Sequence, residues 1–400
     1  MRIFRFNRLE EVKKILDDIG ADPYGVKIML PKANTFLILL TKINNVAANI
    51  LKQEMLSLGA DAAIARNALT GKSKNTDILL IGQLNQFSAL ASKLKIQPFG
   101  LQELAQELDE NIKNFTNNKL VLSLKNRLLN FSKKTYIMGI INLTPDSFSH
   151  DGLYRELSNN YPALALKKAE TMVADGADIL DLGGESSRPG AKSISLKEEL
   201  SRTIPVIKLL AKNIDKPISI DTTKPLVARA ALDAGAQIVN DICGLRNRQM
   251  MQVVARYKAA VVIMHMLGKP INMQKIIAYK SLIEDITIYL KNSISLAQAA
   301  GISPDKIIID PGIGFGKTPV HNLKIIKHLA DFKTLGKPIL VGLSKKSFIK
   351  EVLGASSQSQ VTGTLASCVL AAEYGANIVR VHDVKTASES LKMVDRVKKC

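Results

Sequence analysis

Cysteine and tryptophan are the scarcest residues of this chain of 400 residues, which has three cysteines and no tryptophan. Cys243, Cys368 and Cys400 form no CxxC pair and are odd in number, so neither a structural zinc site nor a disulfide framework is expected. The five histidines do not cluster at metal-ligand spacing, which argues against a histidine-based metal centre. Few cysteines suit a reducing compartment, and we expect a cytoplasmic protein.

Long hydrophobic segments are also missing. No uncharged apolar run approaches the roughly 20 residues that a transmembrane helix needs. The N-terminal letters MRIFRF are basic, but the apolar segment of a signal peptide does not follow them. The sequence therefore predicts no membrane partner.

Acidic residues are outnumbered, with 36 against 55 lysines and arginines, which gives a net charge of +19. Such an excess favours anionic partners, namely nucleic acid, a membrane surface or a phosphorylated substrate. The lysines are dispersed, however, and no RNP, zinc-finger or basic-helix motif accompanies them. We favour a lysine-rich globular protein that does not bind nucleic acid.

Residues 1–118 are expected to form a smaller α/β domain of unknown role. Apolar spacing predicts helices at 9–19, 46–58, 87–94 and 101–115, strands at 36–40 and 77–82, and a linker at 114–118. The letters GKS at 71–73 end like a phosphate-binding loop, but Arg66 stands where the loop needs glycine. A structural or interaction role is favoured over a second active site.

Residues 119–400 have the pattern of a TIM (β/α)₈ barrel. A predicted hairpin at 119–124 and 127–131 leads into eight apolar runs separated by helical segments, which is the number and length typical of this fold. The runs are 136–141, 177–182, 217–220, 237–239, 260–264, 306–309, 338–343 and 378–381. A doubly wound open sheet is the alternative, but no GxGxxG turn follows the first strand.

Polar residues stand at the carboxyl end of every run, where the active site of a TIM barrel lies. In order these are Asn142, Glu185 to Arg188, Asp221, Asn240 with Asp241, His265, Asp310, Ser344 to Lys346, and Arg380 to Asp383. Residues that only form turns would not include the lysine, arginine and histidine residues that follow the last two strands. In TIM barrels the loops after these two strands often bind phosphate. Carboxylates and amides facing cations suit a nitrogen-rich heterocycle that carries a phosphate group. His265, taken alone, is more typical of a core histidine.

A glycine-rich segment, PGIGFGKT at 311–318, follows the sixth run. It fails the spacing of a nucleotide-binding P-loop because its first position is Pro311. We interpret it as a flexible barrel loop that offers Phe315 as a pocket wall.

Eight motifs together resemble one family. INLTPDSFS, DLGGESSRPGA, SIDTTKP, VNDI, MHM, IDPGIGFGKT, LVGLSKKS and IVRVHDV follow one another as in dihydropteroate synthase, across most of residues 135–390. The N-terminal part resembles the extra segment of longer bacterial members. The resemblance implies a transferase that condenses (7,8-dihydropterin-6-yl)methyl diphosphate with 4-aminobenzoate in folate biosynthesis, and that sulfonamides inhibit by mimicking the aminobenzoate.

The same resemblance implies roles for residues of this chain. Asn142 would hold Mg²⁺ on the diphosphate; Ser187, Arg380 and His382 would bind the diphosphate; Asp221, Asn240, Asp310 and Lys346 would bind the pterin; Arg188, Pro189, Phe148, Phe315 and Ser347 would shape the aminobenzoate pocket, with Val381 a further substrate contact. Asp221, Asp310, Lys346 and Arg380 would be the catalytic group. A homodimer through the late helices of the barrel is implied as well.

Two departures from the family pattern are visible. The usual SFSDGG is here SFSHDG, so that His150 takes the place of the loop aspartate and Asp151 follows it. Ser187 replaces the usual threonine and keeps its hydroxyl. A pterin-binding methyltransferase barrel and a non-catalytic pterin-binding paralogue remain the alternatives.

Overall fold

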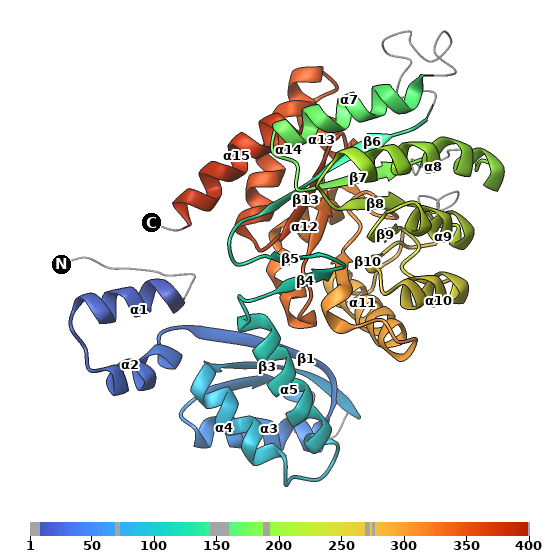
Figure 1. Cartoon of the computed structure of the whole chain (residues 1–400). Coiled ribbons are helices and arrows are strands. Elements are labelled where there is room, and N and C mark those ends of the chain that lie inside the picture. The colour runs from blue at the N-terminus through green and yellow to red at the C-terminus, as the bar shows by residue number, and fades with distance from the viewer. Residues whose placement is uncertain are drawn as a thin grey trace. The chain divides into compact units, whose positions relative to one another are not determined.

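The computed structural model describes residues 9–68, 73–144, 160–186, 193–268, 273 and 277–398. The chain divides into two compact units, Met1–Asn114 and Phe115–Cys400 (Figure 1). No helix among the described residues is long and apolar enough to cross a membrane.

The first unit is a small α/β domain with an antiparallel sheet in the order β1-β3-β2. Its elements are α1 (Leu9–Asp18), α2 (Pro23–Met29), β1 (Thr35–Asn44), α3 (Asn45–Ser57), β2 (Asp61–Ile64), β3 (Asn75–Gln83), α4 (Leu84–Leu94) and α5 (Leu101–Thr116). All four predicted helices and both predicted strands are confirmed, whereas α2 and β2 were not predicted. Helix α5 continues to Thr116 and so occupies part of the predicted linker.

The second unit opens with the predicted hairpin, β4 (Val121–Leu124) and β5 (Arg127–Asn130). Its apolar side chains pack against the inward residues at the amino ends of the barrel strands, such as Met138, Ile179 and Ile308. The Nζ of Lys306 also donates a hydrogen bond to the carbonyl oxygen of Ser123 in the hairpin, at 2.9 Å. The hairpin therefore closes the end of the barrel that lies away from the rim.

Eight parallel strands form the barrel, as predicted. They are β6 (Tyr136–Asn142), β7 (Ile179–Gly183), β8 (Ile218–Asp221), β9 (Ile238–Asp241), β10 (Ala260–Met264), β11 (Ile307–Asp310), β12 (Leu340–Gly342) and β13 (Ile378–Val381). Their order runs β11-β10-β9-β8-β7-β6-β13-β12, and a single parallel bridge between Ile309 and Ile339 joins the two ends.

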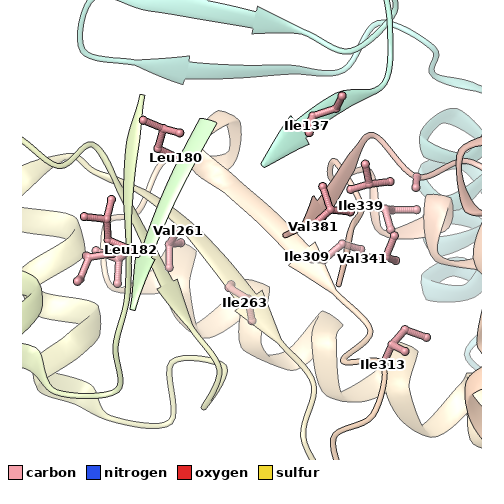
Figure 2. Packing of buried hydrophobic residues seen from close by; sticks show 14 of the residues in the cluster. Ile137, Leu180, Leu182, Val261, Ile263, Ile309, Ile313, Ile339, Val341 and Val381 are labelled. Atoms are coloured by element: carbon pink, nitrogen blue, oxygen red, sulfur yellow. The ribbon is translucent and has the colours of Figure 1, made fainter. Parts of the chain in front are cut away.

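Helices cover the outside of the barrel (Figure 1). They are α7 (Tyr161–Ala174), α8 (Leu196–Asn213), α9 (Pro225–Asp233), α10 (Arg248–Tyr257), α11 (Leu282–Ala299), α12 (Pro319–Lys327), α13 (Ser347–Leu353), α14 (Ser357–Glu373) and α15 (Val384–Val397). Outward strand residues pack against them in one large aliphatic cluster, part of which Figure 2 shows around Ile309, Val341 and Val381.

Side chains alternate between the two faces of each barrel strand, because successive residues of a strand point in opposite directions. In β13, Ile378 belongs to the inner cluster, while Val379 and Val381 belong to the outer one. The same alternation sends the last inward residue of each strand to the carboxyl-end rim, and these are the residues of the candidate site.

Candidate active site

A pocket lies at the carboxyl ends of the strands, and all four of the predicted pterin contacts line it. Its lining consists of Asp221, Asn240, Ile242, Met264, Asp310, Ile313, Phe315, Gly342, Lys346 and Arg380. The structure thus brings together the four residues predicted as the catalytic group, which come from the ends of β8, β11 and β13 and from the turn after β12. Two carboxylates, an amide and two cations face one another there.

Arg380 is the centre of the hydrogen bonds in this pocket. Its Nε donates to Asp181 Oδ2 at 2.6 Å, and its Nη2 donates to Asp221 Oδ2 at 2.8 Å. Asn240 Nδ2 donates to the same oxygen of Asp181 at 3.2 Å. The guanidinium is therefore fixed by carboxylates from two neighbouring strands, β7 and β8.

Asp181 is the residue of this site that sequence reasoning missed. It is fully buried within β7, and its other oxygen, Oδ1, has no hydrogen-bond partner among the described residues. Burying a carboxylate inside an apolar strand costs free energy unless the carboxylate is paired. The position of Asp181 within the run 177–182 therefore indicates a buried carboxylate that has a partner. We find that its partner is Arg380, which lies 199 positions away in the sequence.

Burial in the pocket opposes the charged forms of both rim carboxyls. It raises the pKa of Asp221 to about 7, and nearby Asp181 adds to this effect although Arg380 opposes it. It raises the pKa of Asp310 to about 6, against the hydrogen bond that Gly312 N donates to Asp310 Oδ1 at 2.6 Å. Near neutral pH these groups are poised to gain or lose a proton when a ligand changes their surroundings.

Lys346 reaches the pocket because of the turn that precedes α13. Lys345 has a φ of +57°, a left-handed conformation that is uncommon for a non-glycine residue, and its side chain is exposed. Lys346 is the N-cap of α13, and its Nζ lies 4.4 Å from the centre of the Phe315 ring. Burial lowers the pKa of Lys346 to about 8, while Asp310 favours the charged form. The Phe315 ring provides a face for the ammonium.

The glycine-rich loop holds Phe315 in place by close backbone approach. Gly312 has a φ of +73°, and a Cβ there would lie 1.9 Å from the carbonyl oxygen of His265. Lys317 is buried, and its Nζ donates to His265 Nδ1 at 2.9 Å and to the carbonyl oxygen of Phe315 at 3.1 Å. Burial lowers the pKa of His265 to about 2, so it is a neutral core histidine, as its surroundings in the sequence favoured.

A second polar group lies at the ends of β6 and β13. Asn142 Nδ2 lies 3.4 Å from His382 Nε2, and His382 Nδ1 lies 3.0 Å from the hydroxyl of Ser344. No group of three or more His, Cys, Asp or Glu side chains that could hold a metal ion occurs in the described ranges. This part of the rim offers one amide oxygen, which fits an ion such as Mg²⁺ that takes most of its oxygens from substrate phosphates and water.

The remaining predicted residues have different outcomes. Phe148, His150, Asp151, Ser187, Arg188 and Pro189 lie outside the described residues. Ser347 is the exposed first residue of α13. Val381, a predicted substrate contact, is 1% exposed, and its side chain packs on the helix-facing side of β13 (Figure 2) and does not line the pocket.

Comparison with known proteins places residues 138–382 in the family described as pterin binding enzyme. A dihydropteroate synthase of Synechocystis is 46% identical over 270 residues, which cover 67% of this chain and 92% of that protein. A crystal structure of the Xanthomonas albilineans dihydropteroate synthase with 4-aminobenzoic acid is 37% identical, with a TM-score of 0.65, and covers 70% of this chain and 99% of that one.

A third relative extends beyond the barrel. A probable bifunctional folylpolyglutamate synthase/dihydropteroate synthase of Halobacterium salinarum is 36% identical over 380 residues. The match covers 94% of this chain but only 44% of that protein. Because so much of this chain is matched, the similarity includes most of the N-terminal unit.

The raised pKa of Asp221 predicts how the free energy of unfolding depends on pH. Between about pH 4 and pH 7 the folded protein keeps a proton on Asp221 that the unfolded chain has lost, so its free energy of unfolding falls as the pH rises through this window. In Asp221→Asn this decrease should be smaller by roughly 1–3 kcal/mol, since one pKa unit corresponds to about 1.4 kcal/mol.

The measurement is urea unfolding of both proteins at pH 4.5 and pH 8, roughly the two ends of the titration window. Asp215→Asn, which removes a carboxylate that is 97% exposed, is the control for the change in net charge. An equal loss of stability in the parent protein and in Asp221→Asn would contradict the assignment of the raised pKa to Asp221.

Proposed function

This chain belongs to the dihydropteroate synthases, within the family of pterin-binding enzymes, and we propose that its rim pocket binds the pterin ring and carries out the condensation. In this step of folate biosynthesis, 4-aminobenzoate displaces diphosphate from (7,8-dihydropterin-6-yl)methyl diphosphate. The observation that carries the proposal is the convergence of Asp221, Asn240, Asp310 and Lys346 on one pocket.

The polar groups of the pocket suit the edges of a pterin. The ring offers N–H donors and carbonyl or ring-nitrogen acceptors, for which Asp221, Asp310 and Asn240 provide matching groups and Lys346 a donor. These side chains are buried or half-buried. An analogue that leaves such groups without hydrogen bonds would be rejected, and this is the source of specificity for the pterin.

The reaction needs no nucleophile from the protein. The bond between the pterin methylene carbon and the diphosphate oxygen breaks, and its electron pair leaves with the diphosphate. The amino nitrogen of 4-aminobenzoate then forms the new C–N bond and loses a proton. Positive charge that develops on the pterin is stabilised by Asp221 and Asp310, whose pKa values near neutrality allow them to become ionised as that charge appears.

Arg380 and His382 take part in binding the leaving diphosphate at the neighbouring rim. Arg380 is already fixed by Asp181 and Asp221, so no rearrangement of its side chain is needed. Asn142 would hold Mg²⁺ together with diphosphate oxygens, and the ion would supply positive charge that makes the diphosphate a better leaving group. Ser187 is assigned to the same anion.

The aminobenzoate is assigned to the outer part of the rim. Phe315 and Ser347 contribute to its pocket from the described part of the chain, and Phe148, Arg188 and Pro189 from segments outside it. The ring of Phe315 packs against Lys346, so this wall is shared by the two substrates. Sulfonamides are expected to compete at this position. The free thiols of Cys243 and Cys368 support a cytoplasmic location.

The assay of the proposed reaction measures diphosphate release from the pterin diphosphate, with and without 4-aminobenzoate. Release should depend on 4-aminobenzoate, because C–N bond formation completes the turnover, and it should fall when EDTA removes Mg²⁺. Dihydropteroate should form in equal amount to the diphosphate. Release that proceeds unchanged without 4-aminobenzoate, or binding of the pterin without any turnover, would overturn the proposal.

Lys346 and Lys345 give a matched pair for testing the pocket. Lys346→Ala should lower kcat/KM about ten- to hundredfold, because loss of a charge-assisted hydrogen bond costs roughly 1.5–3 kcal/mol. Lys345→Ala should stay within about threefold, since its side chain is exposed and can remain solvated. Steady-state kinetics on both variants, with Tm values to confirm folding, decides this. The reverse order of effects would mean that the residue facing the pterin is Lys345.

The chain is proposed to form a homodimer through the late helices of the barrel. Exposed apolar side chains on α13, α14 and α15, among them Val352, Leu370 and Met393, support such an interface. Light scattering at micromolar concentration should give twice the 43.7 kDa of one chain. Leu370→Lys should shift this value toward the monomer, and a monomeric parent protein would refute the assignment.

A further inference from the structure

A buried amino group lies next to the pocket wall that Phe315 forms, and the proposed reaction does not use it. Lys317 is 3% exposed. Its Nζ donates hydrogen bonds to His265 Nδ1 at 2.9 Å, to the carbonyl oxygen of Phe315 at 3.1 Å and to the carbonyl oxygen of His265 at 3.4 Å. An ammonium group has three N–H donors, so each of them has an acceptor here.

These hydrogen bonds join the loops that follow two neighbouring strands. His265 is the first residue after β10, and Phe315 and Lys317 belong to the glycine-rich loop after β11. At the ends of the two strands, His265 N donates a hydrogen bond to the carbonyl oxygen of Asp310 at 2.9 Å. The side chain of Lys317 adds a connection between the two loops beyond the ends of the strands.

The two loops also lie against each other at a second position. Gly316 has a φ of +64°, and a Cβ there would lie 2.8 Å from Leu267 Cβ and 3.0 Å from the carbonyl oxygen of Leu267. Only glycine permits this approach without a shift of the neighbouring loop. Phe315 therefore lies in the sequence between Gly312 and Gly316, two positions at which the loop after β11 closely approaches the loop after β10.

The position of the Phe315 ring depends on the backbone that carries it. The ring lines the pocket and packs in an apolar cluster with Met264 and Met266. Lys346 Nζ lies 4.4 Å from the centre of the ring. The carbonyl oxygen of Phe315 is one of the three groups to which Lys317 donates. A shift of this backbone would move the ring, and with it the wall of the pocket.

Stability alone gives a weak reason for burying this amino group. Lysine is almost never fully buried unless it is paired, and the acceptors of Lys317 are carbonyl oxygens and a neutral histidine ring rather than carboxylates. Burial lowers the pKa of Lys317 to about 7, although Asp310 favours the charged form. A methionine of similar length would fill the same space without the cost of desolvating a charge. The amino group is therefore better explained by the position that it gives to Phe315.

We propose that Lys317 is a positioning residue for 4-aminobenzoate, which acts by fixing the backbone of Phe315 to the loop of His265. This inference rests on the proposed function, which assigns Phe315 to the aminobenzoate pocket. Lys317 itself contacts neither substrate, because its side chain is buried and its donors are used within the protein. Its influence should be greater on 4-aminobenzoate than on the pterin ring, because most of the pterin contacts lie on other elements of the rim.

The test is steady-state kinetics of Lys317→Met in the full-length chain, with each substrate varied in turn and Tm values to confirm folding. The KM for 4-aminobenzoate should rise about tenfold or more, because the carbonyl oxygen of Phe315 loses its donor and the loop is released from His265. The KM for the pterin diphosphate should stay within about threefold of the parent value, because its contacts on other elements remain.

A double-mutant cycle with Phe315→Leu shows whether Lys317 acts through this ring. Phe315→Leu removes the aromatic wall and should itself raise the KM for 4-aminobenzoate. If Lys317 acts by placing the ring, adding Lys317→Met to Phe315→Leu should raise this KM by no more than about twofold. A further rise of about tenfold in the Phe315→Leu background would show that the two residues act independently, and it would overturn the proposal.

Lys337 provides a matched control at the opposite end of the barrel. It is 9% exposed, and its Nζ donates to the carbonyl oxygen of Pro304 at 3.0 Å, before β11 and β12. Lys337→Met should change neither KM. Should Lys317→Met not fold, Lys317→Gln keeps an N–H donor on a shorter side chain that cannot serve all the acceptors of the lysine. It should raise the KM for 4-aminobenzoate in the same direction, and an unchanged KM would count against the proposal.

The outcomes are distinguishable. Equal increases in both KM values for Lys317→Met, or no increase in either, would overturn the role of Lys317 while leaving the proposed function intact. An increase for Lys337→Met as large as that for Lys317→Met would show a general effect of removing a buried lysine and would also overturn it. Failure of the parent protein to release diphosphate in response to 4-aminobenzoate would instead refute the proposed function.

Discussion

The bridge that Arg380 makes between Asp181 and Asp221 is the interaction on which the rim depends. It brings three charges into the interior of the barrel, where each of them alone would be prohibitively costly. Removing Arg380 would leave two buried carboxylates without a cation between them. The bridge also explains why the carboxyl of Asp221 is poised near neutrality: burial and Asp181 raise its pKa, and Arg380 alone among its main neighbours lowers it. The pocket is therefore arranged for a ligand that adds positive charge.

The loops around the pocket hold this arrangement in place by adopting backbone conformations that few residues tolerate. The glycine-rich loop after β11 approaches the carbonyl oxygen of His265 too closely for any side chain at position 312, and the turn before Lys346 places Lys345 in a left-handed conformation. Such conformations persist only where neighbouring contacts enforce them. Here the contacts are the hydrogen bond of the buried Lys317 amino group to the carbonyl oxygen of Phe315 and the packing of Phe315 under Lys346. The opposite end of the barrel, under the hairpin of β4 and β5, is filled with apolar side chains.

Much of this was accessible from the sequence. Apolar runs followed by single polar residues predicted both the number of strands and the positions of Asn142, Asp221, Asn240, Asp310 and Arg380, because strand ends in a parallel barrel share one rim. Residues outside the runs were harder. Lys317 and Glu199 carry no periodic signal that separates a buried charge from a solvated one. Val381 lies inside a run, and there the alternation along β13 turns its side chain to the helices rather than to the pocket.

The sequence by itself determined the class of fold, the family and the end of the barrel where the chemistry takes place, since hydrophobic period and motif order are local properties of the chain. Tertiary structure alone decided which charges meet. Asp181 and Arg380, 199 positions apart, and Lys224 with Glu185 and Glu199 pair only because parallel strands from distant parts of the chain end side by side. Pairing across a closed barrel depends on the order and stagger of all eight strands, and no local pattern contains that information.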